Sequence, residues 1–114
     1  MDMYATITLL ELKSPWLFFK LSYLAMHIVL QLRKDKNCLA QKNTGFWTTH
    51  YTMTLWNSEK AMKEFARSGA HLEAMKQSGK LAKEIRILTI PAATLPSWKE
   101  AKERVYKEGK VYHF

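Results

Sequence analysis

Two histidines are the residues whose surroundings in this sequence best suit chemistry. His50 lies in the middle of a threonine-rich segment, and His71 follows the helix-breaking pair Ser68-Gly69. An imidazole can serve as a general acid, a general base or a ligand, because its unperturbed pKa lies near neutrality. Each also has a structural interpretation, in which His50 bonds a threonine hydroxyl and His71 caps or packs a helix. We take both as candidate catalytic residues and leave the structural roles open.

Aromatic side chains are the candidates for substrate binding, since they commonly line apolar ligand pockets. The candidates are Trp16, Phe18, Trp47, Tyr51 and Trp56. Aromatic residues at helix or strand spacing are more often ordinary core, and that alternative stays open.

The sequence lacks the motifs that identify a cofactor or metal enzyme. It has no glycine-rich phosphate loop, no His-Glu-x-x-His and no Gly-x-Ser-x-Gly. Its one cysteine, Cys38, excludes an intramolecular disulfide and a multi-thiolate metal site. We therefore expect no metal and no cofactor. Haem is disfavoured, although His71 would be the better placed of the two candidate axial ligands.

Length and charge limit the remaining classes of function. A chain of 114 residues fits one domain, covering 1–114. The net charge of +8 would suit a nucleic-acid or anionic partner. However, the lysines alternate with acids on helix-like segments and form no basic run, so we expect no nucleic-acid partner. The N-terminus does not read as a signal peptide, and we expect a cytoplasmic protein.

The elements that would position these residues follow from periodicity and capping. Alternation predicts strands, and apolar spacing of three and four predicts helices. Strands are expected at 4–12, 38–42, 46–56 and 84–91, and helices at 16–32, 57–67 and 72–78, with a last helix from the capping box at Ser97. The order β-α-β-β-α-β with a tail helix predicts an α+β, ferredoxin-like split βαβ fold with a four-stranded antiparallel sheet.

The helix at 16–32 is apolar nearly all round, with Lys20, His27 and Gln31 in one narrow polar stripe. We favour a helix that packs on the sheet and on a neighbouring subunit or element. A bilayer-spanning helix and shallow membrane contact are the alternatives. The spanning alternative would place Lys20 and His27 in the bilayer, and we expect no membrane partner.

The strand at 46–56 has two unlike faces. One face carries Trp47, Thr49, Tyr51, Met53 and Leu55, and the other carries Thr48, His50, Thr52, Thr54 and Trp56. The first face is core-like. The threonine face is too mixed for a dry core and too aromatic for full exposure, so we expect it to be the face that the helices leave open.

The segment from Tyr51 to His71, with Trp56-Asn-Ser58, Phe65-Ala66 and His71, resembles a known family. It is similar to the dimeric α+β barrel proteins of the antibiotic-biosynthesis-monooxygenase type, nearest the spheroidene-monooxygenase-like and DUF3291-type branch. Gly45-Phe46-Trp47 supports the same resemblance. The resemblance implies a homodimer in which two sheets pack face to face, here through Thr48, His50 and Thr52.

The same resemblance implies a function. It implies a small, cofactor-independent monooxygenase that acts on an apolar or polycyclic substrate in a cavity of the barrel. The alternative is a non-catalytic ligand-binding or structural protein of the same fold. The haem-degrading branch uses an asparagine, a tryptophan and a histidine whose places here are the 5–8 region, Phe65 and Met75. None keeps the required group, so that mechanism is not carried over.

Overall fold

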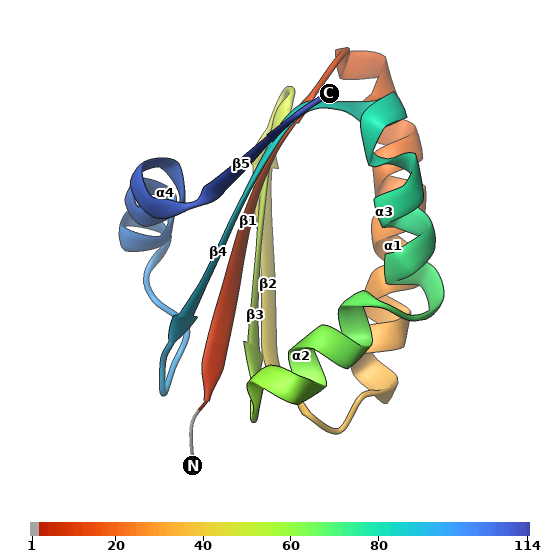
Figure 1. Ribbon diagram of the computed structural model, residues 1–114. Coiled ribbons are helices and arrows are strands. Elements are labelled where there is room, and N and C mark those ends of the chain that lie inside the picture. Colours follow the sequence, from red (N-terminus) through yellow and green to blue (C-terminus); the bar gives the residue numbers. More distant parts are fainter. Residues whose placement is uncertain (1–2) are drawn as a thin grey trace.

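The computed structural model describes residues 3–114 as a five-stranded antiparallel sheet with helices on both faces (Figure 1). The elements in chain order are β1 (Tyr4–Leu12), the 3₁₀ helix η1 (Pro15–Leu17), α1 (Phe18–Lys34), β2 (Cys38–Phe46), β3 (Thr49–Trp56), α2 (Glu59–Ala66), α3 (Gly69–Leu81), β4 (Ala82–Pro91), α4 (Trp98–Glu108) and β5 (Lys110–His113).

The order of strands in the sheet is β2-β3-β1-β4-β5. Its first four strands have the ferredoxin-like arrangement, so the predicted fold class is confirmed. The predicted strand count of four is wrong, because β5 pairs with β4 from Glu84 to Ile87. The edge of β4 presents unpaired backbone groups, and the chain beyond α4 returns to satisfy them. A four-residue strand that follows a helix is too short to be recognised by alternation.

The β2–β3 turn lies at Trp47 and Thr48, later in the chain than the connection at 43–45 between the predicted strands 38–42 and 46–56. Phe46 pairs with Thr49, and Trp47 takes the positive φ of 59°. Trp47 therefore belongs to the turn and not to a strand face. Gly45 has a different role: a Cβ there would lie 2.3 Å from Nδ1 of His50, so the glycine admits the imidazole ring.

Helices α2 and α4 begin at side-chain caps. The hydroxyl of Ser97 accepts from the N–H of Glu100 at 3.2 Å, which confirms the expected start of α4. Helix α2 is capped by Ser58, which accepts from the N–H of Ala61 at 3.1 Å, so it begins at Glu59, two residues after the expected position 57. Helix α3 is longer than expected and ends only at Leu81.

The largest hydrophobic core lies between the sheet and α4. Ala5 and Ile7 of the central strand β1 are fully buried there, with Ala101 and Val105 of α4 above them. Helices α1, α2 and α3 cover the other face of the sheet (Figure 1). That side holds two smaller clusters, one at each end of the sheet.

The threonine face of β3 lies beneath α1, α2 and α3, so its expected role as the open face is wrong. Thr54 lies beside Thr6 of β1, and Thr6 donates to the sulfur of Met62 in α2 at 2.7 Å. A dimer through Thr48, His50 and Thr52 would have to displace the helices. Alternation separates the two faces of a strand but does not tell which helix covers each one.

Candidate functional site

A patch of threonine hydroxyls occupies the centre of the sheet on the side of α1, α2 and α3. We call it the threonine patch, and its residues are Thr6, Thr8, Thr52, Thr54 and Thr89. Thr8 pairs with Thr52, and Thr6 pairs with both Thr54 and Thr89. None of the five is buried, and Thr52 and Thr89 are exposed. On the opposite side of the same central strand, Ile7 is completely buried.

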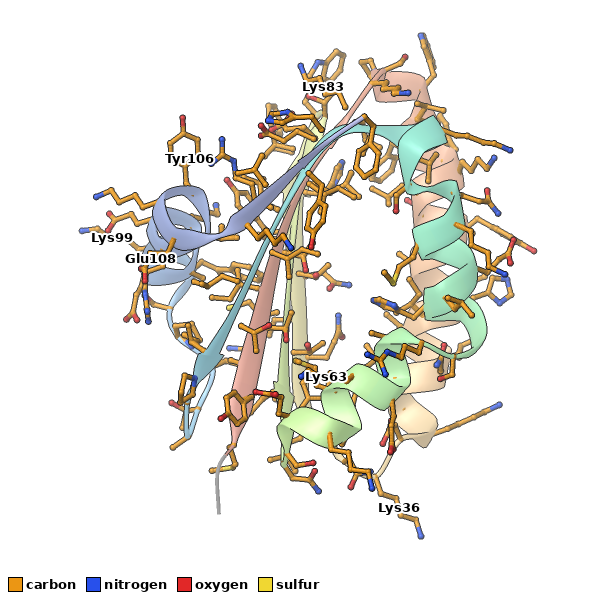
Figure 2. All side chains as sticks on the ribbon, viewed as in Figure 1. Lys36, Lys63, Lys83, Lys99, Tyr106 and Glu108 are labelled. Carbon is orange, nitrogen blue, oxygen red and sulfur yellow. The ribbon has the colours of Figure 1, made fainter. Side chains whose placement is uncertain are left out.

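Two hydrophobic clusters border the threonine patch along the strands. At one end Trp56 and Phe65 pack with Leu32 of α1, and at the other Leu12 and Leu81 pack with Leu24 of α1. The two clusters join α1 to the sheet at its ends. Because the threonines between them remain accessible, the helix side chains do not fill the centre of this layer. Figure 2 shows the side chains of both sides of the sheet.

The polar groups at the threonine patch are neutral. Besides the bond from Thr6 to Met62, the indole Nε1 of Trp56 donates to the hydroxyl of Thr54 at 2.9 Å. Hydroxyls both donate and accept, so they can orient one polar group of an otherwise apolar molecule. They do not titrate near neutral pH and supply no acid or base by themselves.

His71 lies beside the cluster at the Trp56 end of the patch. Its ring is 5.3 Å from that of Phe65, which in turn is 5.1 Å from Trp56. Nδ1 lies 3.2 Å from the carbonyl oxygen of Ala66, and burial lowers the pKa of His71 below its ordinary value. A neutral ring that donates from Nδ1 keeps Nε2 as a proton acceptor. His71 therefore has the protonation state of a general base.

His50 lies at the opposite end of the sheet from His71. Its ring stacks on Phe18 at 5.4 Å, and Nε2 lies 3.1 Å from the carbonyl oxygen of Trp47. Trp56 follows His50 by six positions along β3, a distance of about 20 Å in a strand. The structure thus does not bring the two candidate catalytic histidines into one site.

The aromatic candidates also lie apart. Trp56 is buried at one end of the threonine patch, whereas Tyr51 lies on the other face of the sheet, 6.5 Å from Trp98. Trp16 and Trp47 have 79% and 68% of their surfaces exposed. Of the predicted substrate-binding residues, only Trp56 borders the threonine patch.

Sequence reasoning missed Met62 and Thr89 as neighbours of the patch. Met62 lies in the predicted helix 57–67 and Thr89 in the predicted strand 84–91, and neither was assigned to a site. The sequence does not show which residues pair across strands, so the neighbourhood of Thr89 and Thr6 could not be predicted. Alternation in 84–90 shows only which residues share a face with Thr89. Thr6 and Thr8 fall within the predicted strand 4–12, and Thr52 and Thr54 lie on the predicted threonine face.

Within residues 3–114, no group of three or more His, Cys, Asp or Glu side chains could hold a metal ion. Cys38 is half-buried, and its thiol lies 3.5 Å from the carbonyl oxygen of Ala40. Burial raises the pKa of Cys38, which keeps it in the unreactive thiol form.

Comparison with known proteins agrees with this architecture. The family described as "Domain of unknown function (DUF3291)" matches residues 19–108. A search of curated proteins found no match. Among solved structures, Rv0793 from Mycobacterium tuberculosis aligns with a TM-score of 0.73 at 16% identity, covering 83% of this chain and 99% of that one.

Two further solved structures carry names that describe an activity. One is an antibiotic biosynthesis monooxygenase, with a TM-score of 0.70 at 13% identity, covering 80% of this chain and 99% of that one. The other is a variant of SnoaB, a cofactor-independent oxygenase from Streptomyces nogalater, with a TM-score of 0.67 at 10% identity, covering 85% of this chain and all of that one. At these identities the likeness establishes the ferredoxin-like fold alone.

Proposed function

This chain belongs to the DUF3291 family, and we propose that it is a small monooxygenase-like protein that binds an apolar or polycyclic molecule over the threonine patch. The observation that carries this proposal is the accessibility of the central strand beneath three helices. Thr8 is only half-buried there, whereas Ile7 and Leu9 on the other face are buried. A layer between sheet and helices that is apolar at both ends and polar at its centre suits a ligand with an apolar body and one polar group.

Cofactor-independent oxygenation is the reaction that these residues support. An activated CH₂ group, such as the one between the rings of an anthrone, loses a proton to a base. The electron-rich carbanion passes one electron to O₂, and the radical pair combines to a hydroperoxide. Loss of water then leaves a carbonyl, so that one CH₂ and one O₂ give one C=O and one H₂O. His71 is the candidate base, because its ring packs on Phe65 at the Trp56 end of the patch and burial lowers its pKa, which favours the neutral imidazole. The reaction needs no metal or haem.

Binding without chemistry is the second candidate function. The observation that favours it is that all five side chains of the threonine patch are neutral, while His50 and His71 lie toward opposite ends of the layer. Under this alternative the protein retains a ligand and does not consume oxygen.

Native mass spectrometry of freshly purified protein tests for a retained ligand, and oxygen uptake in the presence of anthrone tests for catalysis. Thr52→Phe places a ring in the threonine patch and is expected to abolish both signals. Thr94→Phe, in the exposed loop after β4, is the control and is expected to preserve them. A protein that retains nothing, or a Thr52→Phe variant that behaves like the control, would refute a site over this patch. Retention without oxygen uptake would favour the second function.

We also propose a homodimer, with its interface on the α4 side of β2 and β3. Helix α4 contacts β1 and β4, and it leaves Thr44 half-buried and Phe46 exposed on the same side of β2. Light scattering at micromolar concentration should give twice the chain mass of 13.3 kDa. A value of 13.3 kDa would contradict the dimer.

A further inference from the structure

The outward side of α1 carries a continuous apolar stripe that no other part of residues 3–114 covers. We call it the α1 stripe, and it consists of Phe19, Tyr23, Met26 and Leu30. Their exposed fractions are 70%, 60%, 54% and 46%. At 100° per residue these four side chains lie within a sector of about 60°. The buried residues Leu24 and Leu32 lie on the opposite side of the helix and face the sheet.

Aromatic residues extend the α1 stripe at the start of the helix. Trp16 of η1 is 79% exposed. Phe18 stacks on His50, which contacts the carbonyl of Trp47, so the β2–β3 turn lies beside this end of α1. The exposed side chain of Trp47 belongs to that turn. Contiguous apolar surface of this kind marks an interaction site in a folded protein.

The charges within α1 itself all have one sign. Segment 13–34 contains no aspartate or glutamate. Lys20 and Lys34 flank the stripe on one side and Arg33 on the other, and all three are exposed. The whole chain has a net charge of +8. An apolar stripe with aromatic residues and cationic margins is typical of a helix that lies in the plane of a membrane interface.

We propose that α1 docks this protein on an anionic lipid surface, with the α1 stripe inserted among the acyl chains and the flanking cations on the headgroups. The proposal departs from the expectation, drawn from sequence, that the protein makes no membrane contact. Helix and 3₁₀ turn together, Pro15–Lys34, are long and apolar enough to cross a bilayer by length and composition alone. A spanning role conflicts with the packing of Leu24 and Leu32, and a surface role does not.

A second copy of this chain fits the α1 stripe less well. Two α1 helices packed antiparallel would bring Lys20 of one against Arg33 and Lys34 of the other. Packed in parallel, they would oppose Lys20 to itself. Since α1 offers no acid to pair with these cations, either arrangement sets like charges against each other. Anionic headgroups neutralise the same cations.

Co-sedimentation with vesicles tests the proposal. Wild-type protein should bind phosphatidylcholine vesicles that contain phosphatidylserine and bind pure phosphatidylcholine vesicles much less. Tyr23→Ser removes one inserted ring and should lower the partition coefficient about tenfold. Lys20→Gln should lower it about fivefold on the anionic vesicles alone.

Tyr106→Ser is the matched control, because Tyr106 is 62% exposed but lies on α4, across the sheet from α1 (Figure 2). Its binding should stay within about twofold of wild type, since its ring is not inserted. Circular dichroism establishes that both tyrosine variants are folded. Absence of binding to anionic vesicles would overturn the proposal, as would equal losses in the two tyrosine variants. So would a dimer that Tyr23→Ser converts to monomer, because it would assign the α1 stripe to a second copy.

Discussion

The contact between α1 and the start of α3 depends on a glycine. Gly69 has a φ of +57°, and a Cβ there would lie 2.9 Å from Oε1 of Gln31. The same glutamine side chain donates to the carbonyl of Ser68 at 3.0 Å and accepts from the N–H of His71 at 3.1 Å. Gly69→Ala would therefore put an L side chain in left-handed backbone and displace Gln31 from both bonds.

The expected cost follows from these two effects. Left-handed backbone costs a non-glycine residue about 1–2 kcal/mol. Each lost hydrogen bond costs about 0.5–1.5 kcal/mol, toward the lower value here because the bond to Ser68 is exposed. We expect Gly69→Ala to lower the free energy of unfolding by about 2–3 kcal/mol in total.

Gly79 in the same helix supplies a control of opposite sign. A Cβ there meets only Cδ1 of Phe114 at 3.4 Å, an ordinary contact, and the backbone is not left-handed. Gly79→Ala should raise the free energy of unfolding by about 0.5–1 kcal/mol, because alanine loses less backbone entropy than glycine when a helix forms.

Urea unfolding followed by circular dichroism measures both substitutions. In a Gln31→Ala background the new Cβ at position 69 no longer meets a glutamine side chain. The loss of stability caused by Gly69→Ala should then fall to the cost of left-handed backbone alone, about 1–2 kcal/mol. A Gly69→Ala protein as stable as wild type would refute the argument. The same penalty with and without the Gln31 side chain would refute the role of the glutamine.

Two further predictions concern a helix cap and a titration. Ser97→Ala should lower the free energy of unfolding by about 1 kcal/mol in urea titrations, because the N–H of Glu100 loses its partner; Ser97→Asp, which can cap, should restore most of it. Burial lowers the pKa of His71, so stability that is full above the ordinary value of 6.5 is lost as pH falls through the pKa of the folded state. The urea midpoint should therefore fall less with acidification in His71→Phe than in wild type, and equal slopes would contradict a buried neutral ring.

The fold was largely predictable because the strong local signals agree with one another. Alternation in β1 and β3 and the capping box at Ser97 each predicted an element that the structure contains. The β2–β3 turn was misplaced because Gly45 is the residue that normally marks a turn. Gly45 instead lies in a strand, where the absence of a side chain makes room for the ring of His50. This close approach becomes visible only once the pairing of β2 with β3 is known.

The candidate site was less predictable, because it depends on which elements lie over which face. The threonine face was recognised, yet sequence alone assigned it to an open surface. The deciding element is α4, whose Ala101 and Val105 pack on the other face and leave the threonines to α1, α2 and α3. His50 and His71 have suitable chemistry as residues, but nothing local could tell that they lie toward opposite ends of the layer.

Packing alone does not account for the threonine patch, and this bears on its function. Thr8 lies on the central strand, where an apolar side chain that became fully buried would contribute about 1.5–3 kcal/mol of stability. On the other face of the same strand, Ile7 and Leu9 are buried in the core, so this strand does carry apolar side chains where it packs densely. Local features that forgo stability are expected at functional sites. A side chain that fills the patch, as in Thr52→Phe, should therefore leave the protein folded while it removes the ligand, and this separation distinguishes a binding site from a packing fault.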